Sequence, residues 1–210
     1  MSEHIAPHIA PTIVQDPSRT YPAHASAGFT LTSAARILAA GGVIAHPTES
    51  VWGLACDPSN AEAVARLVRL KNRPLEKGLI LVSGDVNHFS DLLHNLSGDQ
   101  RARIDATWPG PVTWLVPHFD QVPSWVSGVH HSVALRHTSH PFTAALSRAF
   151  GGPIVSTSAN PAGCQPARHK FQVLRYFGGA LDFVGGGSTG GRGAPSEIRD
   201  ASSGRVVRPG

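Results

Sequence analysis

Lys71 and Arg73 are two cations separated by one residue, at the point where a predicted helix ends. The run 60–70 has apolar residues at helical spacing, and Pro74 disfavours helical backbone at the residue before it. Cations in a last helical turn often only complement the helix dipole. The functional alternative is a phosphate-binding pair, which requires polar partners from other parts of the chain.

Polar side chains stand at the ends of three predicted apolar strands, where α/β proteins place binding residues. Short hydroxyl and amide side chains there can hold a small ligand by directed hydrogen bonds, and an arginine suits a carboxylate. The structural alternatives are a turn bonded to its own backbone and a surface ion pair. The side chains are Thr48 and Glu49 after the strand 43–46, Arg136 at the exit of the strand 132–136, and Ser156 to Asn160 at the end of the strand 153–156.

A glycine-rich segment covers residues 185–193. It lacks the Gly-Lys-Ser/Thr ending of a phosphate-binding loop, and no predicted helix follows whose N-terminus could cradle phosphate. We therefore expect a lid or connection whose backbone can approach a ligand. Gly-x-Ser-x-Gly is absent and no Ser-His-Asp order stands out, so a hydrolase triad has little support.

The elements that must position these residues alternate between strands and helices, which indicates an α/β fold. Some neighbouring strands are too close in sequence for helical crossovers, so we expect a sheet with both parallel and antiparallel pairs. Ser59 and Glu62 match the Ser-x-x-Glu capping box at the start of the helix that precedes Arg73. Thr30 or Thr32 is the expected cap of an earlier helix.

The 210-residue chain is long enough for one sizeable domain, and we assign that domain to residues 29–210. Residues 1–28 contain four prolines and no periodicity, which predicts an irregular arm. The N-terminus has no export signal, and no apolar run reaches the length of a membrane span. We expect no membrane partner.

Cysteine usage and charge restrict the class of protein further. Cys56 and Cys164 stand far apart without a metal-binding pattern, which predicts a reducing, cytoplasmic environment rather than a disulfide framework or zinc ribbon. The net charge of +4 and the pI of about 9.6 indicate an anionic partner such as a nucleotide or RNA.

In chain order, these pieces resemble the YrdC/TsaC family, the threonylcarbamoyl-AMP synthases. The paired signature of that family, Lys-x-Arg followed by Ser-x-Asn, is matched by Lys71, Arg73, Ser158 and Asn160. The resemblance extends over residues 30–210. Within the family, the sequence resembles the short form, without an extra C-terminal domain. Its other pieces are Pro47-Thr48-Glu49, Trp108 to Thr113, Val133 to Arg136, Pro195 to Ile198 and Arg208-Pro-Gly210.

The resemblance implies a twisted mixed sheet flanked by helices, with a concave basic ligand cleft. It implies a nucleotidyltransferase that converts L-threonine, bicarbonate (or carbon dioxide) and ATP into threonylcarbamoyl-AMP and diphosphate. Mg²⁺ is expected to arrive with ATP, with no metal site of the protein's own and no tightly bound organic cofactor. A downstream transferase complex, TsaD with TsaB and TsaE, then modifies the adenosine beside the tRNA anticodon. Binding of tRNA or double-stranded RNA by this chain stays open.

Matched position by position, the resemblance implies roles for ten residues. Glu49 is in addition a candidate for a proton or metal role. Trp52 stands where the family often has Tyr, and Pro166 stands where some relatives have a nucleotide-binding serine, which puts that contact in question. The implied threonine contacts are Thr48, Arg136, Ser156 and Ser196; the nucleotide contacts are Lys71 and Arg73, which are also the catalytic pair, with Ser132, Ser158, Asn160 and Arg208.

Two other functions compete with the synthase. A non-catalytic RNA-binding or ribosome-maturation factor would use the basic surface, although no aromatic-rich RNA motif or arginine-rich run is visible. A carbamoyl-adenylate module of hydrogenase maturation would need further acylphosphatase-like and zinc-binding regions, for which 210 residues leave no room.

Overall fold

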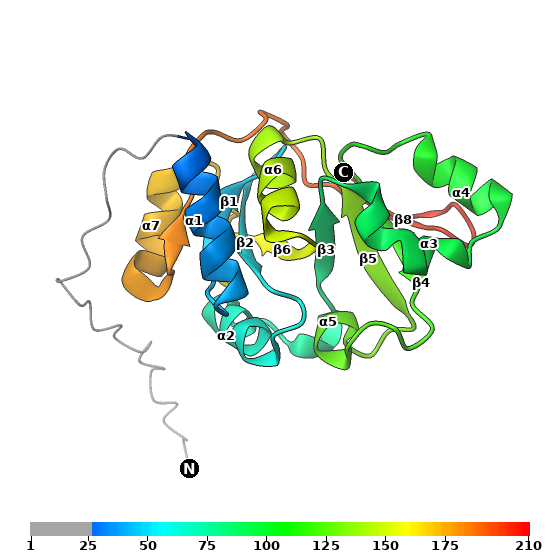
Figure 1. Cartoon of the computed structure of the whole chain (residues 1–210), viewed down its shortest axis with the longest axis horizontal. Helices are drawn as coiled ribbons and strands as arrows, with labels where there is room; N and C mark the ends of the chain where they lie inside the picture. Colours follow the sequence, from blue (N-terminus) through cyan, green and yellow to red (C-terminus); the bar gives the residue numbers. More distant parts are fainter. Residues whose placement is uncertain (1–26) are drawn as a thin grey trace, which may run out of the picture.

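The computed structural model describes residues 27–210, which build one nine-stranded sheet with helices packed against it (Figure 1). The strands are β1 (Ile44–Pro47), β2 (Trp52–Cys56), β3 (Ile80–Ser83), β4 (Val112–Pro117), β5 (Ser132–His137), β6 (Ile154–Ser158), β7 (Phe183–Val184), β8 (Glu197–Asp200) and β9 (Val206–Arg208). The helices are α1 (Ala27–Ala39), α2 (Ala61–Lys71), α3 (Ser90–His94), α4 (Gly98–Asp105), α5 (Ser124–Ser127), α6 (Pro141–Phe150) and α7 (Lys170–Phe177), with short 3-10 turns η1 (Leu75–Lys77), η2 (Val86–Phe89) and η3 (Gly178–Ala180).

The sheet mixes strand directions, as the sequence predicts. Its order within residues 27–210 is β7-β1-β2-β6-β3-β5-β4-β8-β9. Three neighbouring pairs are parallel, namely β1 with β7, β3 with β5 and β4 with β8, and the other five are antiparallel. Strands that are distant in sequence therefore become neighbours, and the polar residues at their ends are brought to one region.

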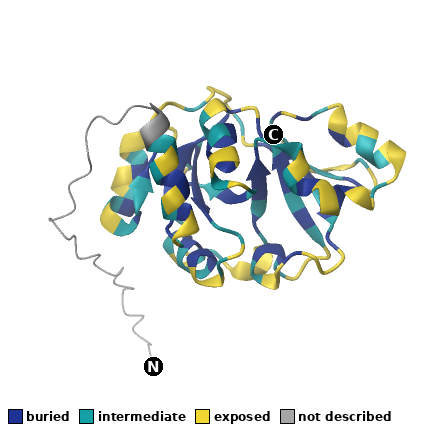
Figure 2. Cartoon of the chain, viewed as in Figure 1, coloured by how far each residue is buried: buried dark blue, intermediate teal, exposed yellow. Residues whose placement is uncertain are grey.

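Alternating side chains build an apolar core on each face of the sheet, because successive strand residues point to opposite faces. Ala45 and Val155 belong to the larger core, while their sequence neighbours Ile44 and Ile154 pack in the smaller one. Helices α1 and α6 lie side by side over the smaller core (Figure 1). Buried residues gather in the strands, and exposed ones lie on the outward faces of the helices (Figure 2).

Helix α2 ends at Lys71, as predicted, and Arg73 follows directly after its cap. Asn72 has a left-handed backbone conformation with φ of 49°. Arg73 N then donates to Val68 O at 3.2 Å, which closes the helix. Both cations are thus carried by the carboxyl end of a packed helix.

The start of α2 differs from the prediction. Asn60 is the cap, and its Oδ1 accepts a hydrogen bond from Ala63 N at 3.0 Å, so the predicted box of Ser59 and Glu62 is wrong. Asparagine caps helices as well as serine does. Ser59 belongs to the preceding turn, since its N donates to Asp57 Oδ1 at 2.8 Å.

Helix α1 also begins earlier than predicted. Because it starts at Ala27, Thr30 and Thr32 lie inside it and neither is its cap. Residues 27 and 28, assigned to the irregular arm, belong to this helix, and the rest of that predicted arm lies outside the described residues. No helix within residues 27–210 is long and apolar enough to cross a membrane.

Sequence patterns miss strand β2. Its residues, Trp-Gly-Leu-Ala-Cys, include weak strand formers, but β2 is hydrogen-bonded on both sides, to β1 and to β6. Residues 86–94 are divided between η2 and α3. The predicted strand starting at 153 extends through Ser158, so Ser156 to Ser158 are strand residues rather than a turn.

Candidate functional site

A cavity of about 890 Å³ opens on the sheet and collects most of the predicted site residues. Eight of the ten line it, whereas Lys71 and Asn160 are not among its lining residues. Its lining includes Arg73, Lys77, Arg136, Arg168 and Arg208 and, within residues 27–210, no Asp or Glu. The eight are Thr48, Arg73, Ser132, Arg136, Ser156, Ser158, Ser196 and Arg208.

Strand periodicity explains why these side chains meet. Ser132, Ala134 and Arg136 are alternate residues of β5, and Ser156 and Ser158 are alternate residues of β6. Strand β3 lies between these two strands and is paired with both. The cavity is therefore built on a continuous sheet surface. Arg136 lies within β5 rather than at its exit, because the strand continues to residue 137.

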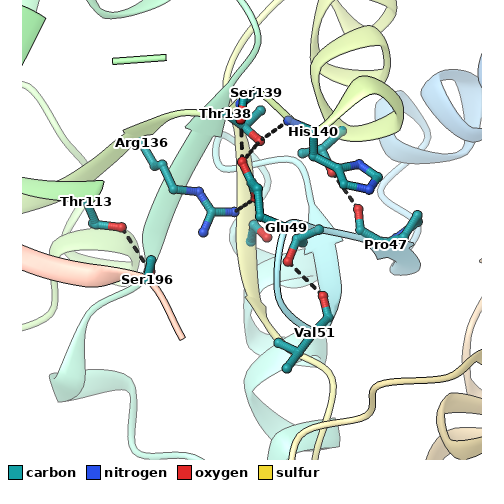
Figure 3. A network of polar contacts seen from close by, with 12 residues as sticks. Pro47, Glu49, Val51, Thr113, Arg136, Thr138, Ser139, His140 and Ser196 are labelled. Carbon is teal, nitrogen blue, oxygen red and sulfur yellow. Dashed lines mark hydrogen bonds and ion pairs between the residues drawn. The ribbon is translucent and has the colours of Figure 1, made fainter. Parts of the chain in front are cut away.

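Arg136 faces the carboxylate of Glu49 in a buried corner of the site (Figure 3). Its Nη2 lies 3.3 Å from Glu49 Oε2, and both side chains are about one-tenth exposed. Glu49 Oε1 accepts hydrogen bonds from Thr138 Oγ1 at 2.6 Å and from Ser139 N at 3.2 Å. Burial works against ionisation, but Arg136 and the Thr138 hydrogen bond outweigh it and lower the pKa of Glu49.

This corner is therefore a charge pair, which we call the Arg136–Glu49 corner. Glu49 holds Arg136 in place, and the proton or metal role considered for Glu49 stays a prediction. Arg136 Nε is buried and has no hydrogen-bond partner among the described residues. An unpaired donor beside a cavity is suited to a ligand acceptor.

Lys71 and Arg73 form the second group of cations, which we call the Lys71–Arg73 corner. Lys71 is 4% exposed, and its Nζ donates to the backbone oxygens of Ser158 and Asn160, the latter at 2.9 Å. Burial and the charge of Arg73 lower the pKa of Lys71 to about 8. Lys71 therefore lies behind the 158–160 segment and supports it, whereas Arg73 reaches the cavity itself.

Carbonyl oxygens, not carboxylates, are the partners of Arg73. Its Nη2 donates to Gly78 O at 3.0 Å and to Lys77 O at 3.4 Å, and its Nε is buried without a hydrogen-bond partner in the described chain. Burial lowers the pKa of Arg73, and burial together with Arg136 and Arg73 lowers the pKa of Arg208. No Asp or Glu among the described residues lines the cavity beside these two arginines.

Thr48 and Ser196 add hydroxyl groups to the cavity lining. Thr48 Oγ1 donates to Val51 O at 2.7 Å within its turn, so its lone pairs remain for a ligand. Thr113 Oγ1 donates to Ser196 Oγ at 3.2 Å (Figure 3). Arg208 Nη2 donates to Ser196 O at 2.7 Å and ties strand β9 to the cavity.

Sequence reasoning missed two cations of the lining. Lys77 and Arg168 are in sequence as ordinary as any exposed cation, and only the fold brings them to the cavity. The glycine-rich segment runs along the Thr48–Glu49 turn, where Gly190 N donates to Thr48 O at 2.9 Å. A Cβ on Gly190 would lie 3.0 Å from the Cα and the O of Glu49, so glycine permits this approach.

Metal ligands are scarce at this site. Among residues 27–210, no group of three or more His, Cys, Asp or Glu side chains is placed to hold a metal ion. Mg²⁺ prefers carboxylate and phosphate oxygens, and the lining offers hydroxyls and cations instead. The donor set does not fit a magnesium site made by the protein alone.

Comparison with known proteins identifies the family of this chain. The family model Sua5/YciO/YrdC, described as telomere recombination, matches residues 36–210. The threonylcarbamoyl-AMP synthase of Cellvibrio japonicus is 55% identical over 176 residues, which cover 84% of this chain and 93% of that protein. The protein of the same name from Pseudomonas putida KT2440 is 52% identical over 182 residues, covering 87% and 98%.

A solved structure shares the fold as well. P. abyssi Sua5 complexed with L-threonine superposes with a TM-score of 0.79 at 28% identity, covering 86% of this chain and 54% of that one. The family match, the similarity along most of the curated relatives and the common fold confirm the resemblance inferred from the sequence motifs. The chain belongs to the Sua5/YciO/YrdC family.

Proposed function

We propose that this protein is a threonylcarbamoyl-AMP synthase, which uses L-threonine, bicarbonate (or carbon dioxide) and ATP and releases diphosphate. One observation carries the proposal: a single cavity joins an arginine suited to a carboxylate with cations that have no carboxylate partner within residues 27–210. An amino acid and a polyphosphate would be neighbours there. The names of relatives more than 50% identical support the same reaction.

Threonine would bind at the Arg136–Glu49 corner. The guanidinium of Arg136, held by Glu49, would receive the threonine carboxylate, since paired N–H donors match a carboxylate well. Thr48, Ser156 and Ser196 offer hydroxyls close by. This arrangement leaves the amine free to add to carbon dioxide, losing a proton to solvent and forming an anionic carbamate.

ATP would bind along the other part of the cavity. Arg73 and Arg208 would meet phosphate oxygens, Ser132 and Ser158 would add hydroxyl contacts, and Asn160 with Lys71 would shape the 158–160 segment. A carbamate oxygen then forms a bond to the α-phosphorus, the bond from that phosphorus to the bridging oxygen breaks, and diphosphate leaves with the electron pair. Positioning and charge neutralisation are the main requirements of such a transfer.

This reaction would make the protein a nucleotidyltransferase. Mg²⁺ would accompany the triphosphate and neutralise part of its charge. The product would pass to a threonylcarbamoyl transferase complex, TsaD with TsaB and TsaE, that modifies tRNA. Two free cysteines, buried Cys56 and exposed Cys164, agree with the cytoplasmic location expected from the sequence. Direct RNA binding has no specific feature of the described residues in its favour.

A single assay tests the reaction. The purified protein is incubated with ATP, Mg²⁺, bicarbonate and labelled threonine, and both diphosphate and threonylcarbamoyl-AMP are measured. We expect diphosphate release that depends on threonine and a labelled adenylate in equal amount. Absence of threonine-dependent diphosphate release would contradict the proposal, whereas release without the adenylate would indicate a different acceptor.

A further inference from the structure

The imidazole of His46 is fully buried directly behind the cavity, and the roles assigned above do not use it. In the sheet register, His46 on β1 lies opposite Gly53 on β2, and Gly53 lies opposite Ser158 on β6. The ring reaches across β2 to the second strand away, where its Nε2 lies 3.1 Å from Ser156 Oγ. A Cβ at Gly53 would lie 2.9 Å from Nε2 and 3.0 Å from Oγ, so the contact requires glycine there.

The partners of the ring decide its tautomer. Thr143 Oγ1, on α6, donates its only proton to Pro47 O at 2.7 Å. The same oxygen lies 2.9 Å from His46 Nδ1 and must therefore accept a hydrogen bond from it. Nδ1 carries the hydrogen, and Nε2 has the lone pair that receives the Ser156 hydroxyl proton.

The opposite tautomer, with the hydrogen on Nε2, would leave one of the two contacts of Thr143 Oγ1 without a hydrogen. With Nδ1 bare, Thr143 would have to give its proton to the ring, and its contact with the Pro47 carbonyl would become repulsive. Thr143 is fully buried, as His46 is, and a buried polar group without a hydrogen-bond partner is destabilising. The ring also stays neutral, since burial, with Arg136 and His140, lowers the pKa of His46 to about 3.

The consequence falls on Ser156, which lines the cavity. Its proton is committed to His46, so its remaining lone pairs can only accept. We propose that His46 is a positioning residue that fixes the Ser156 hydroxyl as a hydrogen-bond acceptor, which selects the amino-acid substrate by one of its donor groups. This rests on the proposed function. Arg136 would donate to the carboxylate, while Ser156 would accept from the amine or the hydroxyl of the same molecule.

The tautomer is tested without any enzymatic assay. Nitrogen-15 correlation spectra of the histidine rings in the wild-type protein should show His46 protonated at Nδ1 and bare at Nε2 throughout the neutral pH range. His46→Gln identifies the signal. A hydrogen on Nε2 would overturn the proposal, whatever the protein catalyses. If the threonine-dependent release of diphosphate fails while Nε2 is bare, the proposed function is wrong and the ring assignment stands.

Substrate kinetics test the consequence. We define the threonine or ATP requirement as the substrate concentration that gives half-maximal rate. His46→Leu should raise the threonine requirement about tenfold, the effect of one hydrogen bond worth about 1.4 kcal/mol. It should change the ATP requirement less than about twofold. His46→Gln should recover most of the loss, because its amide can donate to Thr143 and accept from Ser156. A merely structural role would move both substrates together and would show no such recovery.

The matched control is His88→Leu. The Nδ1 of His88 lies 2.7 Å from Ser83 Oγ on β3, a comparable serine–histidine contact, but neither residue lines the cavity. This variant should leave both substrate requirements unchanged. A threonine requirement in His46→Leu equal to that in His88→Leu would overturn the proposal. Equal increases of the threonine requirement in His46→Leu and His46→Gln would overturn it as well.

The threonine analogue 2-aminobutyrate, which lacks the hydroxyl, identifies the donor. If His46→Leu lowers the preference for threonine over 2-aminobutyrate, Ser156 accepts from the hydroxyl. If both amino acids lose equally, it accepts from the amine. Either result supports an acceptor role for Ser156. Full activity of His46→Leu with both threonine and 2-aminobutyrate would contradict it.

Discussion

The two corners of the cavity bury cations in opposite ways. Arg136 has the carboxylate of Glu49 at 3.3 Å, so the charges of the Arg136–Glu49 corner balance. Within residues 27–210, the partners of Lys71 and Arg73 are backbone carbonyls, and the pKa of each is lowered. The charges of one corner balance without a ligand, whereas the other holds positive charge that a ligand would have to balance.

The difference indicates how each corner recognises its substrate. A balanced pair exerts little net attraction, so the Arg136–Glu49 corner would select by geometry, with an arginine already held in place. Unbalanced charge in a partly dry site attracts anions strongly, so the Lys71–Arg73 corner would bind a polyphosphate mainly by its charge. We therefore expect substitutions to destabilise the fold most at the Arg136–Glu49 corner. We expect an anionic ligand to stabilise the protein mainly through the Lys71–Arg73 corner.

The largest expected effect is on the stability of Arg136→Ala. Loss of this cation leaves Glu49 buried without its charge partner, which typically costs about 3–5 kcal/mol of unfolding free energy. Urea unfolding measures the change. The double variant with Glu49→Gln should be less destabilised than Arg136→Ala alone, because no carboxylate remains to be compensated. If Lys71→Ala is destabilised as much as Arg136→Ala, the contrast between the corners is wrong.

Diphosphate should stabilise the protein by supplying the missing negative charge. At a hundredfold excess over its dissociation constant, binding raises the free energy of unfolding by about 2.7 kcal/mol. Thermal or urea unfolding with and without diphosphate measures this. Arg73→Ala should weaken the effect at a fixed diphosphate concentration, whereas Glu49→Gln should retain it. An equal response of the two variants would show that the anion does not distinguish the corners.

The sequence predicts the cations of both corners but not their balance. Lys71 and Arg73 were located by a helical pattern that ends at Pro74, and this local signal is confirmed by the end of α2. The pairing of Arg136 with Glu49 links residues 87 positions apart and follows from the strand order, which local patterns do not encode. The hydroxyl residues at strand ends were located by a local signal as well, because each follows a short apolar run in the sequence.

Strand β2 marks the limit of such reasoning. Its glycine and alanine give a weak strand pattern, yet β2 lies between β1 and β6, and its Gly53 lets His46 reach Ser156 across it. That contact depends on the register of three strands. The α/β class and the mixed sheet could therefore be predicted from element spacing. A side-chain contact that crosses an intervening strand could not.

Substitution at the Lys71–Arg73 corner should affect ATP more than threonine. Arg73→Ala should raise the ATP requirement about tenfold or more, since one charge-assisted contact is worth about 1.5–3 kcal/mol. Lys71→Ala should raise it as well, because the 158–160 segment loses its support. Arg73 lines the cavity directly, while Lys71 acts through the backbone of Ser158 and Asn160. Initial rates at varied ATP and varied threonine separate the effects. Wild-type activity at subsaturating ATP in either variant would exclude a phosphate role for that residue.

The smallest expected effect is a pH dependence of stability due to Lys71. Its pKa is about 8 in the folded chain and near 10.5 when unfolded, so between these values the unfolded chain binds more protons. The free energy of unfolding contributed by Lys71 should therefore rise with pH in this window, by about 1 kcal/mol from pH 8 to pH 9. Below pH 8 both states are protonated and the contribution levels off at its least favourable value.

Lys71→Met isolates this contribution, because it retains most of the unbranched apolar stem and removes the titrating group. The difference in unfolding free energy between wild type and Lys71→Met should change across the window, while other titrating groups cancel. Diphosphate should reduce the change, since a nearby anion favours the charged lysine and returns its folded pKa toward the unfolded value. Parallel curves for the two proteins without diphosphate would mean that Lys71 does not carry unbalanced charge, and a change unaffected by diphosphate would mean that the anion binds elsewhere.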